Sequence, residues 1–373
     1  MFSSRLDWGL SANRLSELLK AKARVLDLTE SNPTGAGLEY PQEAILEAFS
    51  DARALRYEPD PRGLISAREA VSGYYGSVPA SRVLLTASTS EAYSYLFKLL
   101  CDPGDEILSP RPSYPLFEFL AKLESVRVHQ YSLRYDGAWH IDFDSLSRAI
   151  TPRTRAIVVV NPNNPTGSFL KRDELARLTE FGLPILSDEV FSDYAFSPDG
   201  SRVSTLTGTS DALVFSMSGL SKIAALPQMK LGWIVASGAG HEAALERLEL
   251  IADTYLSVAT PVQVALPKLL AAAVGVRAQI VNRTRANLEL LRERTRDSAA
   301  RPLNVEGGWY AILQVPLTRS EEEWAIRLLD RRGVLVQPGF YYDFESEAFL
   351  VLSLLTAPEI FAEGLDRMIQ ELS

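Results

Sequence analysis

The stretch "TRAIVVVNPNNPTG" (154–167) decides the fold class of this chain. Its first half is a continuous apolar and β-branched run, which is typical of a strand buried on both faces of a sheet. The Asn-Pro and Pro-Thr-Gly steps that follow indicate a turn. Because a strand buried on both faces needs helices above and below it, the stretch predicts an α/β sheet with helices on both sides.

Six further strand-like runs precede or follow this stretch in the sequence. Helix-length amphipathic segments such as 171–182 separate several of them. The runs cover residues 82–88, 105–110, 126–133, 183–191, 211–218 and 230–237. Alternation of strands and helices is typical of parallel sheets. We therefore expect a large domain with a mostly parallel seven-stranded sheet flanked by helices.

The pattern changes after residue 240, where long helical stretches lead into fewer strands. The strand-like segments 308–315, 334–339 and 348–355 alternate with a helix over 319–332 and a final helix. This predicts a smaller α+β domain, onto which the N-terminal segment packs. We expect the large domain to cover residues 40–270, and the small domain to combine 1–39 with 271–373.

Composition excludes several classes of function. The 373 residues carry a net charge of −9 without a basic run, which disfavours nucleic-acid binding. One cysteine and three scattered histidines disfavour an internal disulfide framework and a metal site. We find no apolar stretch of about 18 residues that would cross a membrane and no signal-peptide core at the N-terminus. The expected location is the cytoplasm.

Polar side chains gather where the predicted strands end, and ligands of open α/β sheets bind at these ends. The residues concerned are Ser88, Thr89, Ser90, Asn164, Asp188, Ser221 and Lys222. Each has an ordinary explanation alone: hydroxyls cap helices, Asn-Pro marks turns, and single lysines are usually solvated. Their order and placement together indicate one site, where the hydroxyls and a helix N-terminus would hold an anion.

The motifs, taken in order, resemble fold-type I pyridoxal-phosphate enzymes of the class I/II aminotransferase family. The resemblance runs from about residue 25 to the end of the chain. Its stretches are "RYEPDPRGLISAREAV" (56–71), "TASTSEA" (86–92), "PSYP" (112–115), "NPNNPTG" (161–167), "SDEV" (187–190), "GLSK" (219–222), "KLGW" (230–233) and "VLVQPG" (334–339).

The resemblance implies a role for each matching residue around the cofactor ring. Lys222 would form the Schiff base with pyridoxal 5'-phosphate and later move the substrate's α-proton. Asp188 would pair with the pyridine nitrogen and keep it protonated. Asn164 would hydrogen-bond the 3-oxygen of the ring, and Tyr114 would stack on the ring face.

The resemblance also implies how the phosphate is held. Ser88, Thr89, Ser90 and Ser221 would surround it, with Lys230 supplying positive charge where the family more often has arginine. Tyr57 resembles the tyrosine that reaches the phosphate of the neighbouring subunit. A homodimer with shared active sites is therefore expected.

One departure affects substrate recognition. Val351, in "AFLVLSLL", occupies the position at which the family usually has the arginine that binds the substrate carboxylate. Losing a bidentate, charge-assisted contact removes roughly 3 kcal/mol of recognition. Either another basic residue does this work, for which Arg62 is the first candidate, or the substrate lacks that carboxylate.

Three further departures lie close to the cofactor positions. Phe191 replaces a tyrosine that would donate to the 3-oxygen, so the lysine–cofactor imine should stay protonated to higher pH. Ser31 and Asn32 lie where the family has a glycine-containing substrate loop. Gly219 lies three residues before Lys222, where serine is common.

The cofactor set is thus complete while the carboxylate site is not. This favours a pyridoxal-phosphate-dependent aminotransferase that moves an amino group from an amino acid or amine to an oxo acid or aldehyde, with atypical carboxylate recognition. Two alternatives stay open: a cofactor outcome such as decarboxylation, elimination or oxidation, and a relative that binds the cofactor without turnover.

Overall fold

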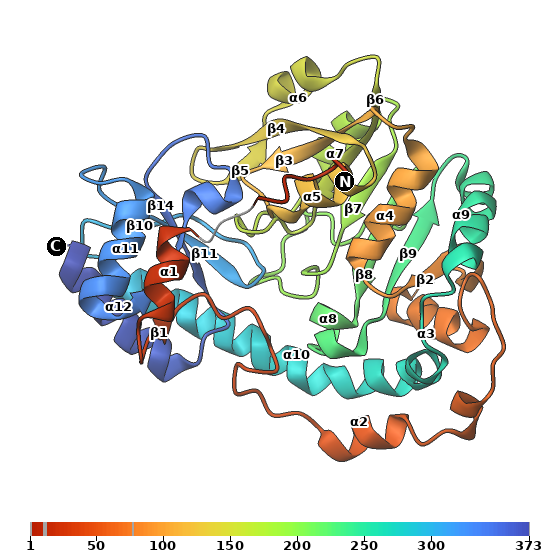
Figure 1. Ribbon diagram of the computed structural model, residues 1–373, viewed down its shortest axis with the longest axis horizontal. Helices are drawn as coiled ribbons and strands as arrows, with labels where there is room; N and C mark the ends of the chain where they lie inside the picture. Colours follow the sequence, from red (N-terminus) through yellow and green to blue (C-terminus); the bar gives the residue numbers. More distant parts are fainter. Residues whose placement is uncertain (1, 10–12, 77, 373) are drawn as a thin grey trace.

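The computed structural model describes residues 2–9, 13–76 and 78–372, and its largest feature is an eight-stranded sheet (Figure 1). The strand order is β2-β9-β8-β7-β6-β3-β4-β5. The strands are β2 (Val83–Thr86), β3 (Glu106–Arg111), β4 (Arg127–Tyr135), β5 (Trp139–Ile141), β6 (Thr154–Val160), β7 (Ile185–Asp188), β8 (Val214–Gly219) and β9 (Gly232–Ser237).

All seven strands predicted for this sheet are present. The strands β4, β3, β6, β7 and β8 pair in parallel, while β9 runs antiparallel to both β8 and β2. The eighth strand, β5, was not predicted; it pairs antiparallel with β4 at the sheet edge. With only three residues, it offers no periodicity that a sequence pattern could reveal.

Strand β6 confirms the prediction of a strand buried on both faces. Ala156, Val158 and Val160 pack into one apolar cluster with α4 and α5, while Ile157 and Val159 pack into another with α6 and α7. The helices around the sheet are α2 (Gln42–Ala48), α3 (Ile65–Tyr75), α4 (Thr89–Leu100), α5 (Leu116–Leu123), α6 (Phe143–Ala149), α7 (Arg172–Thr179), α8 (Leu220–Ile223) and α9 (His241–Tyr255).

The remaining strands form a four-stranded sheet, β10-β11-β14-β13, and the pair β1-β12. They share one apolar core with the helices at both ends of the chain, as expected for the smaller α+β unit (Figure 1). These elements are α1 (Arg14–Lys20), β1 (Leu26–Asp27), β10 (Arg301–Pro302), β11 (Tyr310–Gln314), α11 (Glu321–Arg332), β12 (Val334–Leu335), β13 (Gln337–Pro338), β14 (Phe349–Ser353) and α12 (Pro358–Leu372).

The helix α10 (Thr260–Arg294) runs along both units (Figure 1). Leu266 and Leu269 pack beside β2 and β9, whereas Leu288 and Leu291 belong to the core of the smaller unit. By length and composition alone α10 could cross a membrane, contrary to the sequence expectation, but it packs against α2, α3 and α12 here. It also crosses residue 270, so the proposed domain boundary stays a prediction.

Candidate active site

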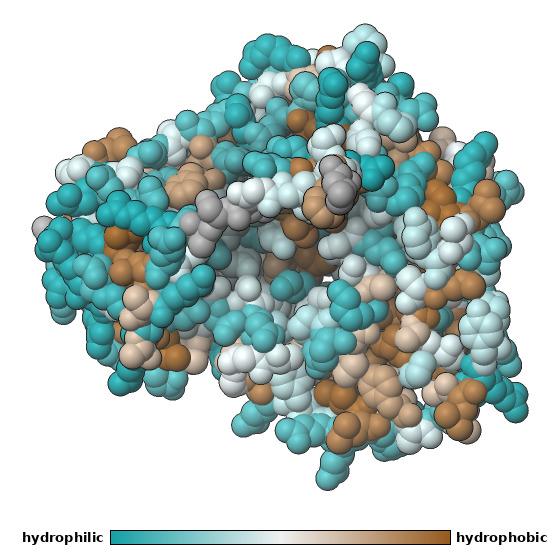
Figure 2. All heavy atoms as spheres, viewed as in Figure 1, coloured by the Kyte–Doolittle hydropathy of each residue, from teal (hydrophilic) through white to brown (hydrophobic). Residues whose placement is uncertain are grey.

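A pocket of about 190 Å³ opens where β6, β7 and β8 end and where α4 and α8 begin. On the face drawn in Figure 2, the surface is hollowed between the two units. The residues that line the pocket are Ser31, Thr89, Ser90, Tyr114, Phe117, Val160, Asn164, Asp188, Val190, Phe191, Ser221, Lys222 and Tyr310. Most of the residues selected from the sequence therefore meet in one place.

Lys222 lies on the short helix α8, directly after β8. The Tyr194 hydroxyl donates to the Lys222 carbonyl oxygen at 2.5 Å, which fixes the backbone that carries the amine. The Lys222 Nζ lies 4.5 Å from the ring centroid of Trp309 and 5.6 Å from that of Phe191. Burial in these surroundings lowers the pKa of Lys222 from 10.5 to about 8, so a useful fraction of the amine is unprotonated and nucleophilic near neutral pH.

Asp188 is the last residue of β7 and faces the same pocket. The Val190 amide and the buried Tyr93 hydroxyl each donate to its carboxylate at 3.3 Å. Burial nevertheless raises the pKa of Asp188 to about 6, because desolvation outweighs these two donors. Its negative charge in turn opposes the lowering of the Lys222 pKa. A buried carboxylate with so few donors is suited to a cationic partner.

The turn after β6 contains three asparagines with different tasks. The Asn161 side chain binds the Val203 carbonyl and the Leu170 amide, so it only braces the turn. The Asn163 oxygen accepts from the Thr166 hydroxyl at 3.0 Å. Asn164 is buried and lines the pocket, yet its side-chain oxygen has no hydrogen-bond partner. A buried, unpaired amide oxygen indicates a group that a ligand would complete.

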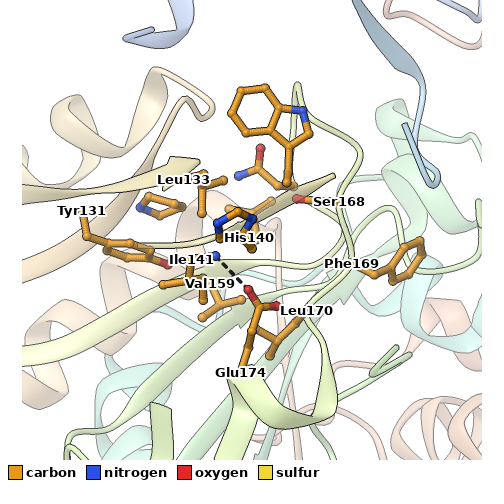
Figure 3. Close-up of a pocket in the computed structure, with 13 residues that line it drawn as sticks. Tyr131, Leu133, His140, Ile141, Val159, Ser168, Phe169, Leu170 and Glu174 are labelled. Atoms are coloured by element: carbon orange, nitrogen blue, oxygen red, sulfur yellow. Dashed lines mark hydrogen bonds between the residues drawn. The ribbon is translucent and has the colours of Figure 1, made fainter. Parts of the chain in front are cut away.

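A second, narrow cavity of about 20 Å³ lies beside this turn (Figure 3). Glu174 points into it from α7 and accepts a hydrogen bond from the Ile141 amide at 2.8 Å, which ties the edge strand β5 to the helix layer. The space suffices for a single water. The residues that line this cavity differ from those that line the pocket of Lys222, and only Val160 belongs to both.

Hydroxyl groups gather at the start of α4 and beside Lys222. Thr89, Ser90 and Ser221 line the pocket, next to the N-terminus of α4, where backbone amides favour an anion. Ser88 does not line it: its side-chain oxygen accepts from the Glu91 amide at 3.2 Å and so caps the helix. For Ser88 the ordinary helix-cap explanation thus accounts for the observed contact.

The close approach of β8 and β9 explains why Gly219 replaces serine. A Cβ on Gly219 would lie 2.8 Å from both the Gly232 Cα and the Leu231 carbonyl oxygen, closer than side chains tolerate. Gly232 also pairs with Thr86, two residues before the N-cap of α4. Lys230, exposed and two residues before Gly232, therefore lies at the edge of the sheet at which α4 begins.

Aromatic residues form the walls of the pocket. Tyr114 is partly exposed and packs edge-on against Phe117. Phe191 is buried and packs edge-on against Trp309, with centroids 5.3 Å apart. Trp309 and Tyr310 were not predicted as site residues, because segment 308–315 was interpreted only as a strand. The aromatic pair after two glycines was the available signal.

The remaining predicted residues lie at different distances from the chemistry. Ser31 lines the pocket, whereas the Asn32 side chain accepts from the Thr34 amide and hydroxyl within its own turn. Val351 is fully buried in the apolar cluster behind the wall. Tyr57 is 77% exposed on the surface.

The structure gives no support to Arg62 as a substitute for the missing arginine. Its guanidinium is paired with Glu249 at 2.6 Å and also donates to the Ser81 carbonyl. It does not line the pocket of Lys222. Glu249 lies on α9, far along the chain, so sequence spacing could not reveal this pairing.

The donor set fits pyridoxal phosphate. The unpaired Asn164 oxygen marks an incomplete polar site at the pocket wall. Asp188 would hold the pyridine nitrogen, Lys222 would bind the aldehyde carbon, and Thr89, Ser90 and Ser221 would hold the phosphate. Within residues 2–9, 13–76 and 78–372, no three His, Cys, Asp or Glu side chains are grouped to hold a metal ion.

Comparison with known proteins gives consistent results. The glutamate-pyruvate aminotransferase AlaA of Escherichia coli K12 is 30% identical over 254 residues, which is 65% of this chain but only 62% of that protein. Human tyrosine aminotransferase is 27% identical over 88% of this chain and 75% of its own length.

Solved structures resemble the fold over almost the full chain. An Escherichia coli aminotransferase superposes with a TM-score of 0.87 at 23% identity, covering 100% of this chain and 98% of its own. The alanine aminotransferase of Pyrococcus furiosus gives a TM-score of 0.85 at 25% identity, covering 96% and 94%. The sequence profile described as "Aminotransferase class I and II" matches residues 23–360. The chain therefore belongs to the class I and II aminotransferase family, whose members use pyridoxal phosphate.

Proposed function

We propose that this chain is an aminotransferase that moves an amino group from an amino acid or amine to an oxo acid or aldehyde. One observation carries the proposal: Lys222, Asp188 and the unpaired Asn164 oxygen converge on a single pocket. The relatives named for glutamate-pyruvate and tyrosine transamination support the same reaction class. Recognition of the substrate carboxylate is atypical, because Val351 provides no charge.

The chain's own residues divide the work of this reaction. When bound, pyridoxal phosphate supplies an aldehyde that captures amines and a ring that draws electrons from the substrate carbon. Asp188 would hold the ring nitrogen in its protonated form, because a buried carboxylate stabilises a cation beside it. Lys222 first holds the cofactor and then carries a proton at Nζ. Phe117, Phe191 and Tyr310 give the pocket apolar surface.

The active unit is proposed to be a homodimer with shared active sites, in the cytoplasm. Leu46, Leu55 and Tyr57 are 73%, 89% and 77% exposed on the segment that includes α2. Exposed apolar groups this close together are typical of a surface that a second copy covers. Light scattering on the purified protein tests the dimer. A Tyr57→Phe variant tests the shared site, because it should weaken cofactor binding without changing the dimer.

Half-reaction spectroscopy tests the proposed reaction. Single amino donors are added to the cofactor-loaded protein, and conversion of the cofactor to pyridoxamine phosphate is followed by absorbance and by mass spectrometry. Conversion is expected with at least one donor and should be lost in Lys222→Ala. If the native protein binds no cofactor, and borohydride traps none on Lys222, the proposal is wrong.

A further inference from the structure

The substrate side of the pocket contains no guanidinium. Of the residues that line the pocket in the described chain, Asp188 and Lys222 alone carry a charge, and both face the cofactor position. The remaining lining on this side is neutral and largely aromatic: Ser31, Tyr114, Phe117, Val190, Phe191 and Tyr310. A carboxylate that enters such a pocket loses its hydration without gaining a cation from the described lining of this chain.

The strand behind this wall does not supply the missing charge. Val351 on β14 pairs with Ile312 on β11. Both are buried in the apolar cluster that also contains Tyr310, Phe191 and Trp309. A charged side chain entering from this strand would have to displace packed aromatic rings.

Two arginines of α10, the helix whose middle packs in this cluster, are already engaged. Arg277 on α10 forms an ion pair with Asp193 at 3.0 Å. Arg283, two turns further along α10, donates to the carbonyl oxygens of Ala36 and Gly37. The Arg283 contacts brace the segment that follows Ser31. Moving either arginine into the pocket would break native contacts.

A carboxylate of the protein lies at the same side. Glu30 precedes Ser31, and its carboxylate accepts from the Asn32 amide at 2.7 Å. In the described part of the chain it forms no ion pair. Its charge acts on Tyr310, whose hydroxyl lies near the Ser31 side chain. Burial raises the pKa of Tyr310 to about 12, so this phenol stays a neutral donor at physiological pH. A second carboxylate brought here by the substrate would be repelled.

We propose that the amino donor is a primary amine with an apolar or aromatic substituent and no carboxylate on the reacting carbon. This inference rests on the proposed aminotransferase function. The Ser31–Tyr310 pair and the ring wall recognise the neutral group that occupies the position of the carboxylate. The charge of Glu30, next to Ser31 in the chain, disfavours acidic competitors.

Binding of two unreactive ligands tests the pocket independently of turnover. Calorimetry on the cofactor-loaded protein compares 3-phenylpropanamide with 3-phenylpropionate, which differ in charge but hardly in shape. We expect the amide to bind at least about tenfold more tightly. Glu30→Gln should narrow that ratio about threefold by improving propionate binding, whereas Glu39→Gln, an exposed neighbour in the same loop, should leave it unchanged. Equal or tighter binding of propionate overturns the inference.

Donor half-reactions give the second measurement. The pair is 2-phenylethylamine and L-phenylalanine, and we expect kcat/KM for cofactor conversion to favour the amine at least about tenfold. A preference for the amino acid overturns the inference but leaves the aminotransferase proposal intact. If no donor converts the cofactor, the proposed function fails. The ratio of the affinities for 3-phenylpropanamide and 3-phenylpropionate then still shows whether the pocket prefers a neutral group over a carboxylate.

Discussion

Replacing Asp188 with asparagine tests the electrostatic coupling that prepares Lys222 for the cofactor. Burial lowers the pKa of Lys222 to about 8, while the negative charge of Asp188 holds it up. Only the unprotonated amine attacks an aldehyde. At pH 7, roughly one tenth of an amine with a pKa of about 8 is unprotonated, against roughly three in ten thousand at the ordinary 10.5.

The rate of cofactor capture should follow this fraction. In stopped-flow absorbance on cofactor-free protein, the capture rate should rise tenfold per pH unit below about pH 8 and level off above it. Asp188→Asn removes the opposing charge, so the midpoint should move down by about one pH unit. Capture by butylamine under the same buffers corrects for titration of pyridoxal phosphate itself.

One result would refute this reasoning. If the capture rate of the native protein keeps rising with unit slope through pH 9 and 10, the Lys222 amine is not desolvated as the structure indicates. An upward shift of the midpoint in Asp188→Asn would show that the carboxylate does not stabilise the ammonium.

Four further outcomes are expected. Tyr194→Phe removes the hydroxyl that holds the Lys222 carbonyl and should weaken cofactor affinity about tenfold, measured by fluorescence titration; unchanged affinity contradicts a positioning role. Glu189→Gln replaces a carboxylate that accepts from Thr205, Leu206 and Ser216 by an amide, whose NH2 group cannot accept. The free energy of unfolding in urea should fall by about 2–4 kcal/mol, and a decrease below about 0.5 kcal/mol is incompatible with this network. Gly219→Ala should lose about 1–3 kcal/mol because its Cβ meets backbone, whereas Gly73→Ala, with open space around it, should be neutral or stabilising. Phe191→Tyr should lower the pKa of the lysine–cofactor imine in an absorbance titration, and no shift would mean that the added phenol does not reach the ring oxygen.

The local sequence pattern was sufficient to predict seven strands of the large sheet but not the edge strand β5. The run 154–160 has one apolar residue after another, and both faces of β6 are buried as that pattern predicts. Strand β5 forms only because β4 offers it a partner and Glu174 holds the Ile141 amide. These contacts come from residues outside the strand, so the sequence of its three residues does not predict it.

The site was predictable where a motif fixes a backbone turn, and less so where tertiary contacts choose among equivalent side chains. Asn161 and Asn164 look equally suitable in the sequence, yet Val203 engages the first and leaves the second free. Only the resemblance to a family distinguished them beforehand. Arg62 was a reasonable candidate from the sequence, but in the structure its guanidinium forms an ion pair with Glu249. Trp309, which lies in the smaller unit, is brought next to the Lys222 amine by tertiary folding.

The helix α10 has a mechanical consequence for the two units. Its ends are embedded in different cores, and Val276 and Ile280 at its middle pack in the cluster that contains Phe191 and Trp309. A rotation of the smaller unit toward the sheet would therefore twist or bend a helix that also packs against Phe191 and Trp309, the rings beside the Lys222 amine. Any displacement of the smaller unit is therefore coupled, through this one helix, to the position of the rings that surround the Lys222 amine.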